Sequence, residues 1–197
     1  MRITGGVLKG RLTEVPNGNM AIRPAMDRMR ESIFGILGDL SGKSFLDLFS
    51  GSGTIAIEAV SHGAYPVSLC EMDKSKAKTV LANVSITEKE LGKKIDCHFM
   101  AVELFLKRCK KQFDFIFFDP PFPYKFRLEL LQTAEKRSLI TENGTIMIHR
   151  PSEDPLPEKI GKLERTDQRV YGRSIVDFYR YSNTSDEQNE KKMLKKV

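Results

Sequence analysis

The chain has 197 residues, of which 40% are hydrophobic and 29% are charged. This length fits one domain with at most a small appendage, and the apolar residues are numerous enough for a proper core. The formal net charge of +6 suggests an anionic partner. No stretch approaches the roughly 18 apolar residues of a membrane span, and the N-terminus lacks the apolar core of a signal peptide, so we expect a cytoplasmic protein that does not bind a membrane.

Cysteine and histidine usage argues against disulfides and against a metal site. The three cysteines include no C-x-x-C pair, and without an export signal they indicate reduced thiols. The three histidines are scattered along the chain. We therefore expect no bound metal.

The N-terminal region, residues 1–42, combines a Gly-rich arm with an amphipathic helix. Residues 5–19 are typical of an extended arm, which we expect to form a short hairpin. We expect a helix from about Asp27 to Leu40, with Asp27 as its N-cap. Basic residues outnumber acidic residues by three over positions 1–43, so the first fifth of the chain carries half of the net charge.

Residues 43–182 alternate between strand and helix signals. We expect strands at 44–49, 66–71, 95–100, 113–118 and 144–149, and helices at 53–62, 74–90, 101–110 and 126–138. This alternation predicts an α/β fold with a parallel, doubly wound sheet. Two strand-like segments, 163–171 and 174–181, predict a hairpin that adds an antiparallel edge. Residues 183–197 are polar and lack a period, so we expect a disordered tail.

A glycine loop follows the first predicted strand of the sheet, in the sequence Ser50-Gly51-Ser52-Gly53-Thr54-Ile55-Ala56. This is a G-x-G-x-x-A pattern between a strand and a helix, in which Gly51 and Gly53 let the backbone approach a ligand. Glu71 lies 20 residues after Gly51, at the end of the next strand, and can accept hydrogen bonds from ribose hydroxyls. These features predict nucleoside binding, but the spacing alone does not separate NAD from S-adenosylmethionine.

The tetrapeptide Asp119-Pro120-Pro121-Phe122 follows the apolar run 113–118. That run is typical of a buried strand, and the prolines end it because neither can donate to a ladder. A plain strand stop is one interpretation of the tetrapeptide. The other is a functional site, because a carboxylate, a rigid turn and an aromatic ring then stand at the edge where open α/β sheets bind ligands.

The chain resembles a class I S-adenosylmethionine-dependent methyltransferase acting on an exocyclic amino group. The resemblance lies in the combination of the first strand of the sheet, the glycine loop, Glu71 and the D-P-P-F turn. Such enzymes carry Asp, Asn or Ser, then Pro-Pro and an aromatic residue, after their fourth strand. Further segments resemble the RsmD family, which methylates N2 of a guanine in 16S rRNA. These segments are Ile3-Thr4-Gly5-Gly6, Lys9-Gly10-Arg11, Arg23-Pro24, Asp27-Arg28, Arg30-Glu31 with Phe34, residues 46–64 (LDLFSGSGTIAIEAVSHGA) and Glu71-Met72-Asp73. The resemblance covers about residues 2–181.

The resemblance implies a Rossmann-like fold, with a mostly parallel seven-stranded sheet, an antiparallel C-terminal hairpin, and a small N-terminal arm and helix. It divides the chain into an RNA-binding arm and helix (1–42), a methyltransferase domain (43–182) and the tail (183–197). The implied methyl donor is S-adenosylmethionine, which leaves as S-adenosylhomocysteine, and no metal is implied. The implied partner is 16S rRNA, within a small ribosomal subunit or its assembly intermediate, and we expect a monomer.

The resemblance also assigns roles to individual residues. In the catalytic turn formed by Asp119, Pro120, Pro121 and Phe122, the Asp119 carboxylate and the Pro120 carbonyl accept the two N–H groups of the amino nitrogen. Phe122 stacks on the flipped base. The residues expected to bind the donor are Asp47, Phe49, Gly51, Gly53, Glu71, Met72, Ala101 and Asp119. The residues expected to contact RNA phosphates are Lys9, Arg11, Arg23, Arg28 and Arg30.

The sequence departs from such enzymes at one position. Met100 precedes Ala101 where an Asp or Asn often contacts the adenine of the donor. We therefore expect the adenine amino group to be bound by the backbone or by another group.

Three other functions remain open at this stage. A DNA adenine or protein glutamine methyltransferase shares the fourth-strand motif, although Asn is the usual first residue in the glutamine-modifying type and the chain has no room for a separate DNA-recognition domain. An NAD-dependent oxidoreductase gives no role to the D-P-P-F turn. A non-catalytic RNA-binding assembly factor would not need Gly51, Gly53, Glu71 and Asp119 together.

Overall fold

The computed structural model describes residues 1–15 and 24–182 of the chain, and its helices and strands alternate as the sequence predicts. Each apolar run becomes a strand and each amphipathic stretch a helix. The elements are α1 (Pro24–Leu37), β1 (Phe45–Leu48), α2 (Thr54–Ser61), β2 (Val67–Cys70), the 3₁₀ helix η1 (Lys74–Lys76), α3 (Ala77–Leu91), β3 (Ile95–His98), α4 (Val102–Arg108), β4 (Phe113–Phe118), α5 (Arg127–Lys136), β5 (Ile140–Pro151), β6 (Lys159–Ile160), β7 (Leu163–Tyr171) and β8 (Ser174–Tyr181).

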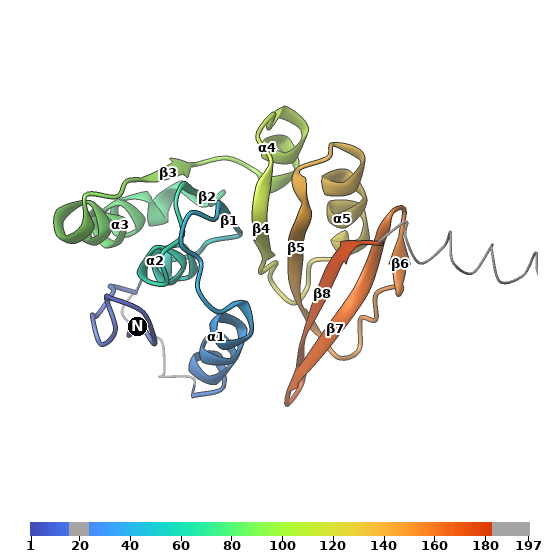
Figure 1. The fold of residues 1–197 in the computed structure, drawn as a ribbon, viewed down its shortest axis with the longest axis horizontal. Coiled ribbons are helices and arrows are strands. Elements are labelled where there is room, and N and C mark those ends of the chain that lie inside the picture. The colour runs from blue at the N-terminus through green and yellow to red at the C-terminus, as the bar shows by residue number, and fades with distance from the viewer. Residues whose placement is uncertain (16–23, 183–197) are drawn as a thin grey trace, which may run out of the picture.

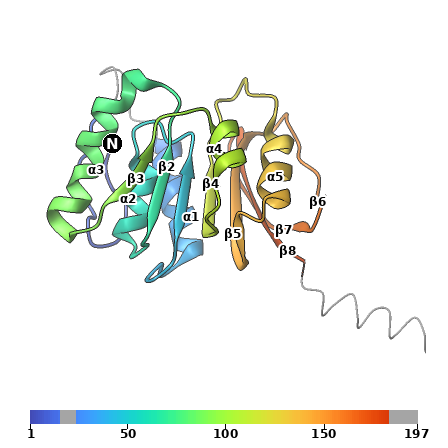
Figure 2. The same cartoon turned by 90° about the horizontal axis from the view of Figure 1, so that it is seen from above.

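The strands form one sheet in the order β3-β2-β1-β4-β5-β8-β7-β6, which Figure 2 follows from one edge to the other. Strands β1 to β5 are parallel, and β8, β7 and β6 are antiparallel additions. This confirms the predicted class, a mostly parallel sheet with an antiparallel C-terminal hairpin. The predicted number of seven strands was wrong, because β6 has only two residues and such a strand leaves no alternating pattern in the sequence.

Two apolar cores lie on the two faces of the sheet, beneath the helices drawn in Figure 1. Helices α1, α2 and α3 cover one face, where Phe34, Ile57 and Val80 pack against residues of the sheet. Helices α4 and α5 cover the other face, with Phe105 and Leu131 in the second core. Every residue of β1 and β2 is buried, including Asp47 and Ser68, as is typical of central strands in a parallel sheet that is covered on both faces.

The N-terminal arm is held on α2 by a buried glutamate. Glu58 accepts hydrogen bonds from the backbone N–H groups of Thr4 and Gly5, at 2.9 and 2.7 Å. Gly6 lies so close to α2 that a side chain there would clash with the Ser61 carbonyl oxygen, at 2.0 Å from the added carbon. Within residues 1–15 the arm folds back on itself through a β-bridge between Arg2 and Leu12 and a backbone hydrogen bond from the Ile3 N–H to the Arg11 carbonyl at 2.8 Å, so this part of the expected hairpin is a loop rather than a pair of strands. Residues 16–19 of the expected hairpin lie outside the described residues.

Helix α1 begins earlier than the sequence suggests. It starts at Pro24, a residue favoured in the first turn of a helix, and not at Asp27. Asp27 therefore lies inside the first turn rather than at the N-cap, and its carboxylate pairs with Arg30 at 2.5 Å. In the ranges 1–15 and 24–182, no helix is long and apolar enough to cross a membrane.

Candidate active site at the carboxyl edge of the sheet

The predicted site residues gather at one edge of the sheet because parallel strands end at the same side. Strand β1 lies between β2 and β4, so the loops after these three strands are neighbours. Hydrogen bonds join them directly: the Ser50 N–H donates to the Cys70 carbonyl at 3.0 Å, and the Asp119 N–H donates to the Leu48 carbonyl at 3.1 Å. The glycine loop, Glu71 and the D-P-P-F turn are thus brought together.

The glycine loop needs its glycines for backbone conformation. Gly51 and Gly53 have φ angles of 61° and 79°, in the left-handed region that other residues adopt only with strain. The Gly51 N–H donates to a carboxylate oxygen of Glu71 at 2.8 Å. A side-chain carbon built on Gly51 would meet no atom within 4 Å, so the loop leaves open space above Gly51, where a ligand can approach the backbone.

Asp47 is a fully buried carboxyl group at the centre of this edge. One oxygen, Oδ2, accepts hydrogen bonds from the Ser50 hydroxyl at 2.7 Å and from the Ala56 N–H at 3.1 Å. The other oxygen, Oδ1, is buried with no hydrogen-bond partner among the residues described. Burial, with further repulsion from Asp119 and Glu71, raises the pKa of Asp47 to about 7. A buried acceptor without a donor is costly, which makes this oxygen a good site for a cationic ligand group.

Glu71 is held in place at the end of β2. Besides the Gly51 N–H, its carboxylate accepts the Asp73 N–H at 2.8 Å and lies 3.5 Å from the Lys76 ammonium. A carboxylate can accept about four hydrogen bonds, so lone pairs remain for a ligand. Beside it, the Met72 side chain is 66% exposed.

Two further expected donor-binding residues flank these groups. Phe49, directly after β1, has a φ of 62° and packs its ring against Tyr124, with the ring centroids 5.3 Å apart. Ala101 is the extended residue at the start of α4. Met100, which precedes it, packs against the second core, and its carbonyl accepts a hydrogen bond from the Cys70 thiol at 3.2 Å.

The D-P-P-F turn contains a contact that the sequence did not reveal. Phe118 pairs with Ile148 in the sheet, so the next residues, Asp119 and His149, stand side by side. Asp119 Oδ1 lies 2.7 Å from His149 Nδ1. The histidine is 3% exposed and the aspartate 30% exposed, so the carboxylate remains accessible while its partner is buried. The Phe122 ring, 48% exposed, meets the His149 ring edge-on at 5.5 Å between centroids.

A buried arginine fixes the backbone that follows Asp119. Arg127, at the start of α5, is 2% exposed and donates from Nη2 to the carbonyls of Pro121 and Phe122 at 2.9 and 3.1 Å. Its Nη1 donates to the Tyr124 carbonyl and pairs with Asp154. Among the described residues, no hydrogen bond is made by the Pro120 carbonyl. The turn therefore has a rigid backbone, and beside the Asp119 carboxylate the carbonyls of Asp119 and Pro120 accept no hydrogen bond from the described residues.

Sequence reasoning missed both His149 and Arg127. His149 is the last residue of the predicted strand 144–149, and a polar residue at the end of a strand adjacent to the D-P-P-F strand was a usable signal. Arg127 had no comparable signal, because an arginine at a helix start is ordinarily exposed.

The basic residues of the N-terminal region divide into two kinds. Lys9, Arg11 and Arg28 are exposed, and Arg11 pairs with Glu90 at 2.8 Å. Arg30 is buried, and it donates to the Arg2 carbonyl at 2.9 Å and pairs with Asp27. The expectation that Arg30 contacts phosphate therefore needs correction, because its guanidinium holds the arm against α1. Arg23 lies outside the described residues.

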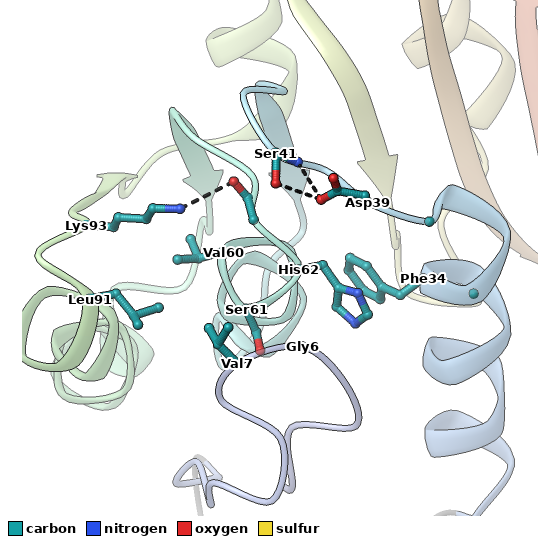
Figure 3. A pocket seen from close by; sticks show the side chains of 13 residues that line it. Gly6, Val7, Phe34, Asp39, Ser41, Val60, Ser61, His62, Leu91 and Lys93 are labelled. Atoms are coloured by element: carbon teal, nitrogen blue, oxygen red, sulfur yellow. Dashed lines mark hydrogen bonds between the residues drawn. The ribbon is translucent and has the colours of Figure 1, made fainter.

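A cavity of about 730 Å³ lies elsewhere, where the arm meets the loops that lead into β1 and β2. Phe34 and His62 stack beside it, and Ser41 and Lys93 also line it (Figure 3). These loops stand at the amino ends of the strands, opposite the site described above. The residues that the structure describes include no cluster of histidine, cysteine or carboxylate side chains able to hold a metal ion.

Comparison with known proteins gives consistent results over nearly the whole chain. Residues 1–180 match the family described as conserved hypothetical protein 95. YlbH of Bacillus subtilis (strain 168), which is named provisionally as an rRNA methyltransferase, is 33% identical over 91% of this chain and 98% of its own length. Ribosomal RNA small subunit methyltransferase D of Escherichia coli (strain K12) is 27% identical over 91% of this chain and 89% of its own length.

Solved structures share the fold. The protein yhhF from Escherichia coli, provisionally named as a methyltransferase, superposes with a TM-score of 0.80 at 24% identity, covering 93% of this chain and 99% of the other. SMU.776, which is also named provisionally as a methyltransferase and is complexed with SAH, superposes with a TM-score of 0.66 at 18% identity, covering 87% of this chain and 58% of the other. These likenesses establish a methyltransferase-like fold. The family match over residues 1–180 and the 33% identity with YlbH over 91% of this chain show that this chain belongs to the RsmD family.

Proposed function

We propose that this protein transfers a methyl group from S-adenosylmethionine to the exocyclic N2 of a guanine in 16S rRNA. Membership of the RsmD family and the relatives named as small subunit rRNA methyltransferases support the reaction class. The observation that carries the proposal is the turn at the carboxyl end of β4, where the Asp119 carboxylate and the unpaired Pro120 carbonyl stand together. Two acceptors beside each other match the two N–H groups of an amino nitrogen.

The donor side of the site fits the methionine and ribose parts of S-adenosylmethionine. The buried, unpartnered Oδ1 of Asp47 can accept from the ammonium, and Glu71 has lone pairs left for the ribose hydroxyls. Gly51 leaves room for a ligand to approach the backbone. We place Phe49, Gly53, Met72 and Ala101 in the same site. When bound, the donor supplies a methyl group on a positively charged sulfonium.

On the acceptor side, the chain's own residues position the nucleophile. The lone pair of guanine N2 is delocalised into the ring, and hydrogen bonds from its N–H groups to Asp119 and Pro120 localise it and fix its direction. Two prolines and the Arg127 contacts keep these acceptors rigid, which positioning requires. The half-exposed Phe122 ring stacks on the base, and after transfer the cationic nitrogen gives its extra proton to the Asp119 carboxylate.

We propose that residues 1–42 contact the RNA, through Lys9, Arg11 and Arg28 on the described surface, and that residues 43–182 carry the chemistry. Such contacts position RNA without reading its sequence. The proposed substrate is 16S rRNA in a small ribosomal subunit or an assembly intermediate, acted on by a monomer in the cytoplasm. A non-catalytic assembly factor is disfavoured because the donor and acceptor groups are complete in one place.

Methyl-labelled S-adenosylmethionine offered together with small ribosomal subunits, naked 16S rRNA, DNA and release factors tests the proposal. Digestion of the labelled product to nucleosides should place the label on guanine N2 of the rRNA. Label on adenine of DNA, or on protein glutamine, would overturn the proposal in favour of another amino-group methyltransferase. Absence of any transfer, with RNA still bound, would favour the assembly factor.

A further inference from the structure

We propose that Asp119, held by His149, selects guanine by accepting the N1–H and an N2–H of the base at the same time. The inference rests on the proposed function and concerns how the site chooses the base. It makes Asp119 a specificity-determining residue and His149 a positioning residue. Both act in addition to the acceptance of the amino group described above.

The geometry of the pair fixes the orientation of the carboxylate. Asp119 Oδ1 and His149 Nδ1 are 2.7 Å apart, and an ionised carboxylate can only accept, so the proton of this bond sits on Nδ1. His149 Nε2 is buried without a hydrogen-bond partner among the described residues, which suits the bare nitrogen of a neutral ring better than a second N–H. The ring cannot turn freely, because it is 3% exposed and packed against Phe122.

The surroundings of Asp119 offer acceptors and few donors. Pro120 and Pro121 have no N–H, and the N–H of Asp119 itself is used by the Leu48 carbonyl at 3.1 Å. The Arg127 guanidinium already donates hydrogen bonds to the Pro121 and Phe122 carbonyls and to Asp154. The Asp119 carboxylate, which is 30% exposed, and the Pro120 carbonyl, which accepts no hydrogen bond among the described residues, are therefore the acceptors that the turn offers to a base.

The Asp119 carboxylate can only accept hydrogen bonds, which matches guanine and conflicts with the other amino bases. Beside its amino group guanine carries N1–H, a donor, whereas adenine and cytosine carry a bare ring nitrogen there. A carboxylate facing that nitrogen would set two lone pairs against each other. Each Asp119 oxygen has two lone pairs, so Oδ1 can keep its bond to His149 while the carboxylate binds two donors of guanine.

Base analogues at the methylated position test this inference. 2-Aminopurine keeps the amino group but has a bare N1, and 6-thioguanine keeps both the amino group and N1–H while changing position 6. The wild-type enzyme should methylate guanine and 6-thioguanine at similar kcat/KM and 2-aminopurine roughly ten- to a hundredfold more slowly, the usual value of a bidentate base contact. Similar rates on guanine and 2-aminopurine would overturn the inference while leaving the proposed function intact. Failure on guanine itself would instead refute the proposed function.

Three variants test whether the preference for guanine over 2-aminopurine depends on the contact between Asp119 and His149. Asp119→Asn presents one acceptor and one donor, so its preference for guanine over 2-aminopurine should fall by roughly tenfold or more. His149→Leu should lose the same preference, whereas His149→Asn keeps an N–H near the position of Nδ1 and should retain most of it. The preference is the ratio of kcat/KM on guanine to kcat/KM on 2-aminopurine for the same enzyme sample, so a loss of stability or of donor affinity in a variant affects both bases equally and does not change the ratio. A preference unchanged in both Asp119→Asn and His149→Leu would contradict the assignment.

Discussion

The side-chain amide of Asn83, in α3, donates a 2.9 Å hydrogen bond to the carbonyl of Ser52 in the glycine loop. The same amide donates to the Glu14 carbonyl at 2.9 Å and accepts the Glu14 N–H at 2.7 Å. One buried side chain therefore connects the N-terminal arm to the loop that we propose binds the donor. Thr13 and Thr54 add a second link, with their hydroxyl oxygens 3.2 Å apart.

Removing this link should loosen the glycine loop. Asn83→Ala deletes three hydrogen bonds and leaves the buried Ser52 carbonyl and two part-buried backbone groups of Glu14 without their partner, which should lower the free energy of unfolding by about 1–3 kcal/mol. It should also weaken binding of S-adenosylmethionine, as measured by calorimetric titration. Ser85→Ala, on the same helix, is the control and should change neither quantity, because the Ser85 hydroxyl bonds only within the helix. Unchanged donor affinity in Asn83→Ala would mean that the link does not support the loop.

The raised pKa of Asp47 predicts that donor binding depends on pH. Its pKa is raised to about 7, mainly by burial, so below that pH the carboxyl group becomes protonated. Since the ammonium of the donor needs the ionised form, donor affinity should fall by roughly tenfold per pH unit below the pKa of Asp47. Calorimetric titration at several pH values checks this. Asp47→Asn should bind weakly at every pH, and a sloping profile in that variant would assign the dependence to another group.

The same group has a predictable effect on stability. The pKa of Asp47 rises from 3.8 to about 7 on folding, so the folded protein holds more protons between these values. The contribution of Asp47 to stability is therefore complete at low pH and is lost as the pH rises through about 7. Asp47→Asn should be more stable than the wild type at alkaline pH and similar to it in acid. Urea unfolding at both pH values measures the difference.

Arg127 should affect turnover rather than donor binding. Arg127→Met removes the donors that hold the Pro121 and Phe122 carbonyls, and misplacement of the turn should lower kcat by roughly a hundredfold. Arg127→Lys keeps the charge beside Asp154 but cannot bind several carbonyls at once, so its kcat should also fall. Single-turnover kinetics and donor titration separate the two effects. A variant that loses donor affinity instead would show that Arg127 supports the whole edge of the sheet.

Arg28 and Arg30 form a matched pair on α1. Arg30→Ala leaves the partly exposed Asp27 carboxylate and the Arg2 carbonyl without their donor and removes a buried side chain, and should lower the free energy of unfolding by about 1–3 kcal/mol. Arg28→Ala changes an exposed residue and should leave stability within about 0.5 kcal/mol of the wild type. Its effect should be on RNA affinity, with a shallower dependence on salt. Equal loss of stability in both variants would contradict the different placements.

The sequence correctly predicted those helices and strands whose bounds are set by the local pattern of residues. The strand at 113–118 has the same bounds in the structure, because an apolar run ended by two prolines leaves no other boundary. The predicted helix 74–90 is divided into η1 and α3, since Asp73 caps the short 3₁₀ turn through the Ser75 N–H at 3.0 Å. Strand β6 was missed because two residues carry no period.

The motifs of the candidate site could be predicted from the sequence, but the side chains that contact these motifs could not. Gly51, Glu71 and Asp119 could be placed at one edge because parallel strands end together. The contact between Asp119 and His149 depends on the register of β4 against β5, and the burial of Arg30 and Arg127 depends on tertiary packing. Neither register nor packing of this kind can be derived from spacing along a single chain.

Methyl transfer by Asp119→Ala, compared with the wild type on the same rRNA substrate, is the most direct test of the role of the D-P-P-F turn. N2-methylguanosine formation should fall by roughly a hundred- to a thousandfold, because the positioned acceptor of the amino group is gone. Calorimetric titration of the same sample should show donor binding largely intact, since Asp47 and Glu71 remain. Wild-type rates of N2-methylguanosine formation in Asp119→Ala, or loss of donor binding in its place, would contradict the role given to this turn.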